Sequence, residues 1–155
     1  MEPTTQVGER TMSRNPVKPG RSPVATGTVL LVDDERDILV SYKALIEATH
    51  PGVRVVTAMT GPEGLEVLAH TRVDAVVSDY KMPGMDGLAF LEKVREALPK
   101  IPRMLFTAYA DEGLARRVRE QGIAHAFVSK ADHPRDFLQH VGRLLTSREQ
   151  RVPSS

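Results

Sequence analysis

Residues 28–34 read Thr-Val-Leu-Leu-Val-Asp-Asp, an apolar run rich in β-branched residues that ends abruptly in two carboxylates. Three later runs have the same form, because each is a short, mostly apolar segment followed by a polar residue able to handle a phosphoryl group. They are residues 73–78 before Asp79, residues 103–106 before Thr107, and residues 126–129 before Lys130. The carboxyl ends of parallel strands open on one edge of a sheet, so we expect these polar residues to meet there.

Segments of helical periodicity separate these runs, and the alternation predicts an α/β fold. Residues 54–58 supply one more strand, so the pattern predicts a doubly wound, five-stranded parallel sheet with five helices on its two faces. The expected sheet-facing stripes of the first, third and fifth helices are Ile38, Leu39, Tyr42, Leu45 and Ile46; Leu88, Leu91, Val94 and Leu98; and Phe137, Leu138, Val141, Leu144 and Leu145. We expect Asp86 and Asp111 to cap the third and fourth helices, and Asp132 and Pro134 to open the fifth.

A chain of 155 residues has room for about one domain, and 41% apolar residues are enough to fill one core. Residues 1–27 contain four prolines among polar residues and show no apolar periodicity, so we expect a flexible tail there. The predicted domain spans residues 28–146. Residues 147–155 are expected to form a frayed end.

Composition argues against several classes of partner. The formal net charge is +1, which provides no electrostatic reason to expect nucleic-acid or membrane binding. The chain has no cysteine, so disulfides and thiolate metal sites are impossible. Its apolar runs fall well short of the ~20 residues that a bilayer span requires. We therefore expect a soluble, cytoplasmic protein.

Asp33, Asp34 and Asp79 would form a cluster of carboxylates if the runs are neighbouring strands. Carboxylates packed together repel one another, and Mg²⁺ is the kind of hard cation that oxygen ligands of this type bind. The Asp79 carboxylate can also act as a nucleophile towards phosphorus. The Thr107 hydroxyl and the Lys130 ammonium can then bind oxygens of the transferred group.

These residues, taken in order, resemble the receiver domain of bacterial two-component response regulators. The matching motifs are Val32-Asp33-Asp34-Glu35, Ser-Asp-Tyr-Lys-Met-Pro-Gly-Met-Asp-Gly at residues 78–87, Thr107-Ala108, and Phe127-Val128-Ser129-Lys130. The resemblance covers about residues 28–146. It implies a flavodoxin-like (βα)5 fold with strand order 2-1-3-4-5.

The resemblance also implies a function. Asp79 would accept a phosphoryl group from a histidine of a kinase or phosphotransfer protein. Asp33, Asp34, Asp79 and the carbonyl of Lys81 would hold Mg²⁺. We expect no enzyme activity beyond slow self-catalysed phosphotransfer and dephosphorylation.

In the family, the signal leaves the site through side chains that correspond to Thr107 and Phe127. Thr107 would shift towards the new phosphate, and Phe127 would turn inward in response, although a static core role suits Phe127 equally well. The expected output surface comprises helix four, strand five and helix five, where Arg116 and Arg119 could contact a downstream protein. The resemblance is compatible with a monomer or with a phosphorylation-dependent dimer.

The chain departs from the family pattern after Lys130, where Ala131 replaces the usual proline. A cis peptide costs about 2.5–4 kcal/mol without proline, so we predict a trans Lys130–Ala131 bond. Lys81 and Tyr109 occupy positions at which family members tune phosphate lifetime. We hypothesise that both side chains overhang the site and slow attack by water.

Two other functions fit parts of the pattern. A receiver fold could serve as a phosphorylation-independent adaptor, although the full set of phosphate-handling residues argues against that role. An aspartyl-phosphate phosphatase similar to the haloacid dehalogenase family would need an acid two residues after its nucleophile, where this chain has Lys81. The histidines show no spacing typical of metal ligands.

Overall fold

The computed structural model describes residues 24–151, with side chains described as far as residue 147. Five strands alternate with five helices along the chain. The strands are β1 (Thr26–Val32), β2 (Gly52–Ala58), β3 (Ala75–Ser78), β4 (Arg103–Thr107) and β5 (Ala126–Ser129). The helices are α1 (Arg36–Thr49), α2 (Gly61–His70), α3 (Gly87–Ala97), α4 (Glu112–Glu120) and α5 (Pro134–Arg151).

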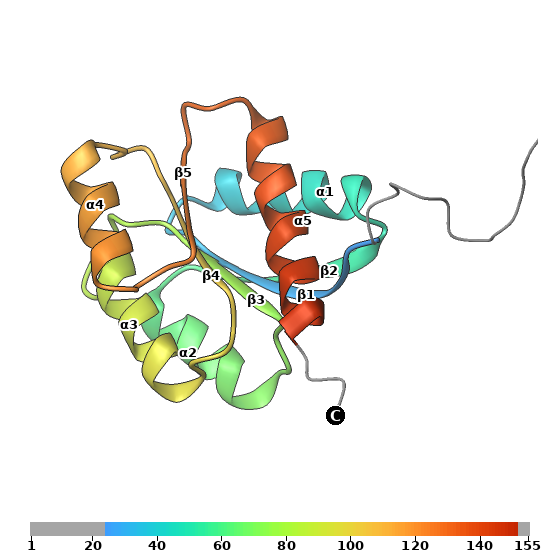
Figure 1. Ribbon diagram of the computed structural model, residues 1–155, viewed down its shortest axis with the longest axis horizontal. Coiled ribbons are helices and arrows are strands. Elements are labelled where there is room, and N and C mark those ends of the chain that lie inside the picture. Colours follow the sequence, from blue (N-terminus) through green and yellow to red (C-terminus); the bar gives the residue numbers. More distant parts are fainter. Residues whose placement is uncertain (1–23, 152–155) are drawn as a thin grey trace, which may run out of the picture.

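The strands form one parallel sheet in the order β2-β1-β3-β4-β5, which confirms the predicted topology. Strand β1 lies between β2 and β3 and pairs with both, so that Val29 is opposite Val55 of β2 and Ala75 of β3. Helices α1 and α5 lie on one side of the sheet, and α2 and α3 lie on the other (Figure 1). Because every strand runs in the same direction, all carboxyl ends lie at one edge.

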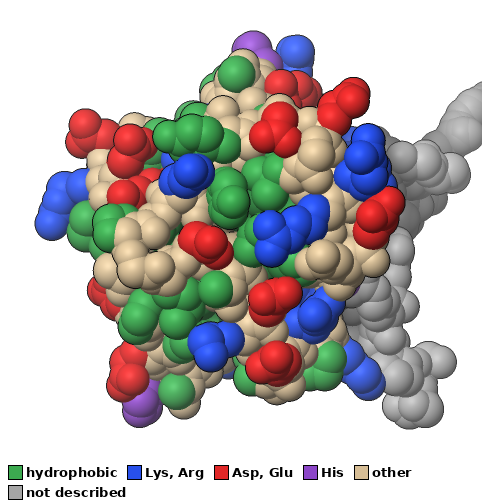
Figure 2. Space-filling view, turned by 90° about the vertical axis from the view of Figure 1, so that its left-hand side faces the viewer, with side chains coloured by type: hydrophobic (Ala, Val, Ile, Leu, Met, Phe, Trp, Pro, Cys, Tyr) green, Lys and Arg blue, Asp and Glu red, His purple; other side chains and the backbone are tan. Residues whose placement is uncertain are grey.

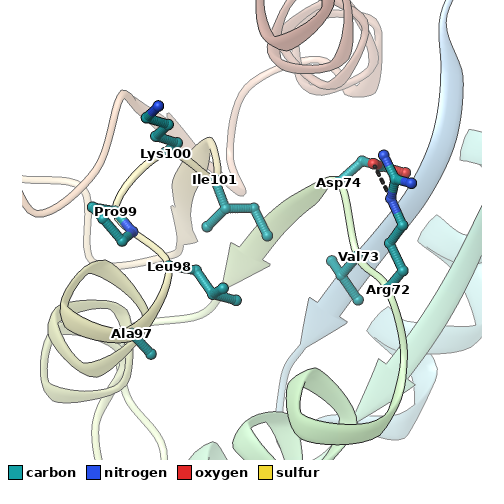
Figure 3. Close-up of a pocket in the computed structure, with 8 residues that line it drawn as sticks. All are labelled: Arg72, Val73, Asp74, Ala97, Leu98, Pro99, Lys100 and Ile101. Atoms are coloured by element: carbon teal, nitrogen blue, oxygen red, sulfur yellow. Dashed lines mark ion pairs between the residues drawn. The ribbon is translucent and has the colours of Figure 1, made fainter. Parts of the chain in front are cut away.

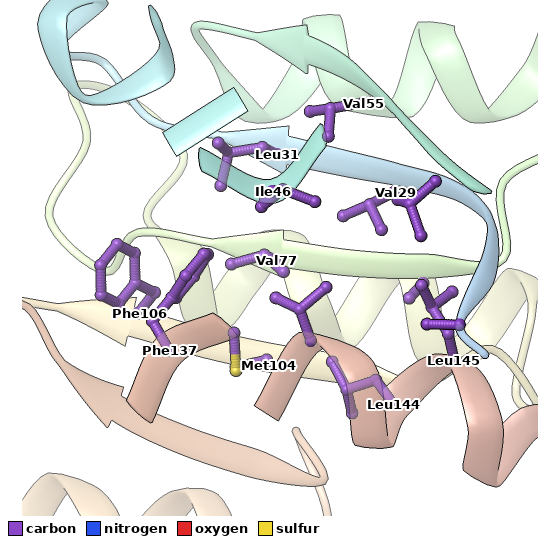
Figure 4. Close-up of a cluster of buried hydrophobic side chains, with 14 of the residues drawn as sticks. Val29, Leu31, Ile46, Val55, Val77, Met104, Phe106, Phe137, Leu144 and Leu145 are labelled. Atoms are coloured by element: carbon purple, nitrogen blue, oxygen red, sulfur yellow. The ribbon is translucent and has the colours of Figure 1, made fainter. Parts of the chain in front are cut away.

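The sheet separates two hydrophobic cores. The first lies under α1 and α5, where side chains of β1, β3 and β4 meet the buried faces of both helices (Figure 4). Its largest members are aromatic: the Phe106 and Phe137 ring centroids are 4.3 Å apart, and Tyr42 packs edge-on against both rings. The second core lies under α2, α3 and α4 and contains Phe90, which is fully buried.

Two residues of the predicted helix stripes lie on the surface instead. Leu45 is 37% exposed because it lies at the outer margin of the α1 stripe, away from the buried Leu39 and Ile46. Leu98 is 40% exposed because α3 ends at Ala97, which leaves Leu98 as the capping residue beyond the last turn. The remaining members of the three stripes are buried or packed against the cores.

Side-chain caps begin most of the helices. Asp86 accepts a hydrogen bond from the Ala89 amide, and Asp111 accepts one from the Leu114 amide, which confirms both predicted caps. Helix α5 begins at Pro134, as predicted, but Asp132 lies two residues before it and does not cap it. The ring of His133, directly before Pro134, accepts the Arg135 amide at 3.0 Å, whereas Asp132 bonds back to the Ser129 amide at 3.4 Å.

Three elements extend further than the sequence predicts, whereas β3 begins at Ala75 and not at Val73. Strand β1 begins at Thr26 rather than residue 28, and β2 begins at Gly52 rather than Arg54. The residues added to β1 are Thr26 and Gly27, and those added to β2 are Gly52 and the buried Val53. Thr26 lies opposite Gly52 in the parallel ladder, so pairing between the two strands carries both of them past the predicted starts. Helix α5 continues to Arg151, beyond the predicted boundary at residue 146. The predicted tail at residues 1–23 lies outside the described residues, as do residues 152–155.

A buried arginine was not anticipated from the sequence. Arg103 opens β4 and is only 3% exposed. Its guanidinium donates hydrogen bonds to the carbonyls of Pro99, Ile101, Gly122 and Ile123. These bonds join the loop before β4 to the turn after α4 at the amino edge of the sheet.

Candidate functional site

Side chains from three strand ends converge at the carboxyl edge of the sheet. The Lys130 ammonium, directly after β5, lies 2.6 Å from Asp33 Oδ2 and 3.4 Å from Asp79 Oδ2. Asp33 follows β1, and Asp79 follows β3. The structure therefore brings together residues that are far apart in the sequence, as the runs before Asp33, Asp79 and Lys130 predict.

Backbone hydrogen bonds extend the sheet beneath these residues. The Asp33 amide donates to the Ala58 carbonyl at 3.1 Å, and the Asp79 amide donates to the Val32 carbonyl at 2.9 Å. The Lys130 amide donates to the carbonyl of Thr107 at 2.9 Å. The backbone of each polar residue is thus bonded to the last residue of a neighbouring strand. This bond fixes the position from which the side chain extends.

The Asp79 carboxylate is constrained on both of its oxygens. Oδ1 accepts the Tyr80 amide at 2.8 Å, and Oδ2 faces the Lys130 ammonium. Burial raises the pKa of Asp79 above its ordinary value, and the charge of Asp33 adds to that effect, while Lys130 opposes it. The negative charges of Asp33 and Asp79 lie close together and repel each other, and this repulsion favours binding of a cation beside them.

Lys130 is the positive centre of the site. Burial alone would lower its pKa, but the hydrogen bond to Asp33 and the charges of Asp33, Asp79 and Glu35 outweigh burial and raise it. The ammonium therefore carries its charge at neutral pH and can bind an anionic oxygen.

Oxygen ligands for a metal ion lie beside the ammonium. Asp33, Asp34 and Asp79 each offer a carboxylate oxygen, and these three atoms lie within 4.8 Å of one another. Asp33 and Asp79 are buried, whereas Asp34 is more accessible. A set of clustered carboxylate oxygens with one accessible member fits Mg²⁺, which prefers oxygen ligands and retains water.

Thr107 ends β4 and is fully buried. Its hydroxyl oxygen accepts the Tyr109 amide at 3.1 Å, which places the hydroxyl at the start of the loop that leads to α4. Lys81, in the loop after β3, lies with its ammonium 4.9 Å from the centroid of the Tyr109 ring. The contact between Lys81 and Tyr109 therefore joins the loops that follow β3 and β4.

Residues 29–142 match the model of the response regulator receiver domain. The chain belongs to this family. The transcriptional regulator NtrC of Escherichia coli K12 is 39% identical over 97 residues, which is 62% of this chain and 20% of NtrC. GlrR, a transcriptional regulatory protein of the same organism, is 37% identical over 128 residues, or 82% of this chain and 27% of GlrR.

Solved structures agree. A CheY-like receiver domain protein from Methanospirillum hungatei JF-1 is 30% identical, with a TM-score of 0.73 over 81% of this chain and 98% of that chain. The signal receiver domain of a histidine kinase from Syntrophus aciditrophicus is 31% identical, with a TM-score of 0.71, and the match covers 84% of this chain and 97% of that chain. The present chain spans about a fifth to a third of the curated relatives it matches.

The residues expected to form the receiver domain's output surface lie on its last elements. Arg116 and Arg119 are exposed on α4. Phe127 is half-buried and packs against the second core. On the face that carries α4, acidic and basic side chains are interspersed with hydrophobic ones (Figure 2).

The peptide between Lys130 and Ala131 is trans, which confirms the prediction made from the missing proline. The Ala131 amide, which a proline would lack, donates to the Ser129 hydroxyl oxygen at 3.0 Å. The loop from which Lys130 contacts Asp33 and Asp79 is therefore held by a hydrogen bond to the Ser129 side chain.

A mostly apolar groove of about 400 Å³ lies at the opposite edge of the sheet. Val73, Leu98 and Ile101 point towards the space between two loops, and Arg72 pairs with Asp74 beside it (Figure 3). The groove lies where β3 and β4 begin, so it is separate from the acidic cluster. None of the helices in the described part of the receiver domain is long and apolar enough to cross a bilayer.

Proposed function

We propose that this receiver domain is a phosphorylation-activated signalling switch that accepts a phosphoryl group on Asp79. The donor would be a phosphohistidine on a kinase or phosphotransfer protein. The observation that carries the proposal is the placement of a buried Asp79 carboxylate 3.4 Å from the Lys130 ammonium and within the acidic cluster.

In the proposed reaction, an Asp79 oxygen attacks phosphorus, an O–P bond forms, and the P–N bond to the donor imidazole breaks. The electron pair of the P–N bond stays on the imidazole nitrogen. Lys130 would bind one oxygen of the transferred group, because an ammonium is a compact positive charge. Thr107 would donate its hydroxyl hydrogen to another oxygen, because the hydroxyl oxygen only accepts in its bond from the Tyr109 amide.

The acidic cluster would hold Mg²⁺ through Asp33, Asp34 and Asp79, with the Lys81 carbonyl as a further ligand. The ion would neutralise negative charge on the phosphoryl oxygens and on the carboxylates. Lys130 compensates part of the charge of Asp33 through the 2.6 Å ion pair. Asp34 has no ion pair among those found at the site, which leaves it available to a cation.

Output would pass from Thr107 to Phe127 and then to the surface of α4, β5 and α5. Arg116 and Arg119 would contact a downstream protein there, in a monomer or in a phosphorylation-dependent dimer. A cytoplasmic location is part of the same proposal. The alternative of a phosphatase is disfavoured, because Lys81 contributes an ammonium over the Tyr109 ring where that chemistry needs an acid.

Incubation with Mg²⁺ and acetyl phosphate, followed by intact mass measurement, tests the proposal. We expect the wild type to gain one phosphoryl group and Asp79→Asn to gain none. Asp86→Asn is the matched control, because Asp86 caps α3 and asparagine caps helices equally well. An unmodified wild type would favour the phosphorylation-independent adaptor.

A further inference from the structure

We propose that Ser78 and Gly87 are positioning residues that orient the Asp79 carboxylate through the peptide unit between Asp79 and Tyr80. The inference rests on the proposed role of Asp79 as phosphoryl acceptor. It assigns a function to a buried hydroxyl and to a glycine that lie outside the group of residues expected to touch phosphate or metal.

The peptide unit between Asp79 and Tyr80 binds the acceptor directly. Its N–H group donates to Asp79 Oδ1 at 2.8 Å, so the direction of this N–H sets the rotation of the carboxylate. The same rotation determines which way Oδ2 faces, and Oδ2 is the oxygen that lies near Lys130. A peptide unit is planar, so holding its carbonyl oxygen also fixes its N–H.

Ser78 holds the oxygen side of this peptide. Its hydroxyl donates to the Asp79 carbonyl oxygen at 2.8 Å. The Ser78 side chain is completely inaccessible to solvent. A buried hydroxyl has no water to bind in place of this carbonyl, so the bond resists rotation of the peptide.

Gly87 limits the peptide from the other element. A Cβ atom at this first residue of α3 would overlap the Asp79 carbonyl oxygen, so only glycine allows the helix to start against it. The Gly87 amide also donates to the Tyr80 carbonyl at 2.7 Å, which closes the loop between β3 and α3. The two contacts place the carbonyl groups of Asp79 and Tyr80 against the first residue of α3.

Removing the Ser78 hydroxyl should therefore slow phosphorylation without removing any group that touches the phosphate. Loss of one buried hydrogen bond predicts about a two- to tenfold slower rate at saturating acetyl phosphate. The donor concentration that gives half the maximal rate should stay unchanged, because the groups expected to bind the donor remain. Ser78→Thr keeps the hydroxyl and should restore the rate.

Gly87→Ala should have a larger effect, since the methyl group must displace the Asp79 carbonyl. Gly64→Ala is its matched control. A Cβ at Gly64 would also crowd its surroundings, at 2.9 Å from the Phe90 ring, but it would touch nothing in the peptide that holds Asp79. Both glycine variants should unfold at lower urea concentration, whereas only Gly87→Ala should shift the Tyr80 amide resonance and slow phosphorylation.

The experiment measures phosphorylation of full-length wild type, Ser78→Ala, Ser78→Thr, Gly87→Ala and Gly64→Ala by mass, with urea unfolding and the NMR shift of the Tyr80 amide. The proposal is supported if Ser78→Ala is phosphorylated more slowly and shows a shifted Tyr80 amide resonance, and if Ser78→Thr is phosphorylated at the wild-type rate. A Ser78→Ala variant with the wild-type rate and Tyr80 resonance overturns it, even if Gly87→Ala does not fold. A wild type that gains no phosphoryl group contradicts the proposed function instead, so the two failures can be distinguished.

Discussion

Lys130 and Asp33 form an ion pair of 2.6 Å between residues 97 positions apart in the chain. The pair joins the end of β5 to the end of β1, although β3 and β4 lie between those strands in the sheet. Asp33 is 1% exposed, so its charge depends on Lys130 for compensation. A long lysine side chain can reach across two strands, which makes Lys130 a partner of both Asp33 and Asp79.

Replacing Lys130 with glutamine should reduce phosphorylation of Asp79 by acetyl phosphate at least tenfold. The substitution removes the positive charge near the transferred oxygens, and charge-assisted hydrogen bonds contribute about 1.5–3 kcal/mol. It should also lower the free energy of unfolding, because Asp33 is left buried without its cation. Lys100→Gln, at an exposed lysine at the other edge of the sheet, should change neither quantity. A Lys130→Gln variant phosphorylated at the wild-type rate would contradict the proposed role.

Asp34→Asn should weaken Mg²⁺ binding about tenfold or more, because it removes a charge from the accessible member of the acidic cluster. Titration with Mg²⁺ followed by NMR measures this affinity. Asp37→Asn removes the same charge from an exposed residue in the first turn of α1, outside the cluster, and should leave the affinity near the wild-type value. Equal weakening in both variants would indicate a general charge effect instead of a ligand.

The phosphoryl group should be lost faster from a Lys81→Ala, Tyr109→Ala double variant than from the wild type. The ammonium–ring contact at 4.9 Å joins two loops beside the site, and an exposed contact of this type contributes about 0.5–1 kcal/mol. We therefore expect a two- to fivefold faster decay by mass measurement after removal of the donor. Faster decay in the wild type than in the double variant would exclude the shielding hypothesis.

The stability that the Glu47 carboxylate contributes at neutral pH should be lost in acid. On the outer side of the edge strand β2, Glu47 Oε2 accepts the Val55 amide and the Lys43 ammonium, both at 2.9 Å. The bond from Val55, followed by that from Lys43, lowers the pKa of Glu47. A carboxyl with a lower pKa in the folded state contributes stability above its unfolded pKa, and this contribution disappears as the pH falls through its folded pKa.

Urea unfolding of wild type and Glu47→Gln at neutral pH and below about pH 4 measures this contribution. We expect the wild type to be more stable at neutral pH and the difference between the two proteins to shrink in acid. Glu96→Gln, at an exposed position of α3, should follow the wild type at both pH values. A difference that stays constant with pH would show that the charge of Glu47 is not responsible.

Much of the fold follows from local sequence patterns. Strands β3 and β4, which lie within the apolar runs before Asp79 and up to Thr107, are buried along their whole length, as the composition of the runs indicates for inner strands. Asp86 and Asp111 cap helices as expected, since capping depends on residues only three positions apart. Leu45 and Leu98 were predicted wrongly, because periodicity does not reveal where a helix leaves the sheet or ends.

The buried Arg103 and the cap provided by His133 illustrate a different limit. An arginine inside a strand gives no sequence signal of burial, because its stability depends on carbonyls of Pro99, Ile101, Gly122 and Ile123 supplied by two other segments. His133 caps α5 although Asp132 is the better capping residue by type, because the Asp132 carboxylate faces back towards Ser129. Both outcomes depend on neighbours that the local sequence does not specify.

The sequence by itself determined the parallel α/β architecture and the identity of the residues at the strand ends, because strand periodicity and residue type are local properties. Only the tertiary structure decided how those residues are paired: Lys130 with Asp33 at 2.6 Å and with Asp79 at 3.4 Å. It also placed Ser78 and Gly87 against the carbonyl oxygen of one peptide unit. Distances and burial of this kind arise only when the sheet register and the helix starts bring separate segments together, and electrostatic and hydrogen-bond energies depend on those distances.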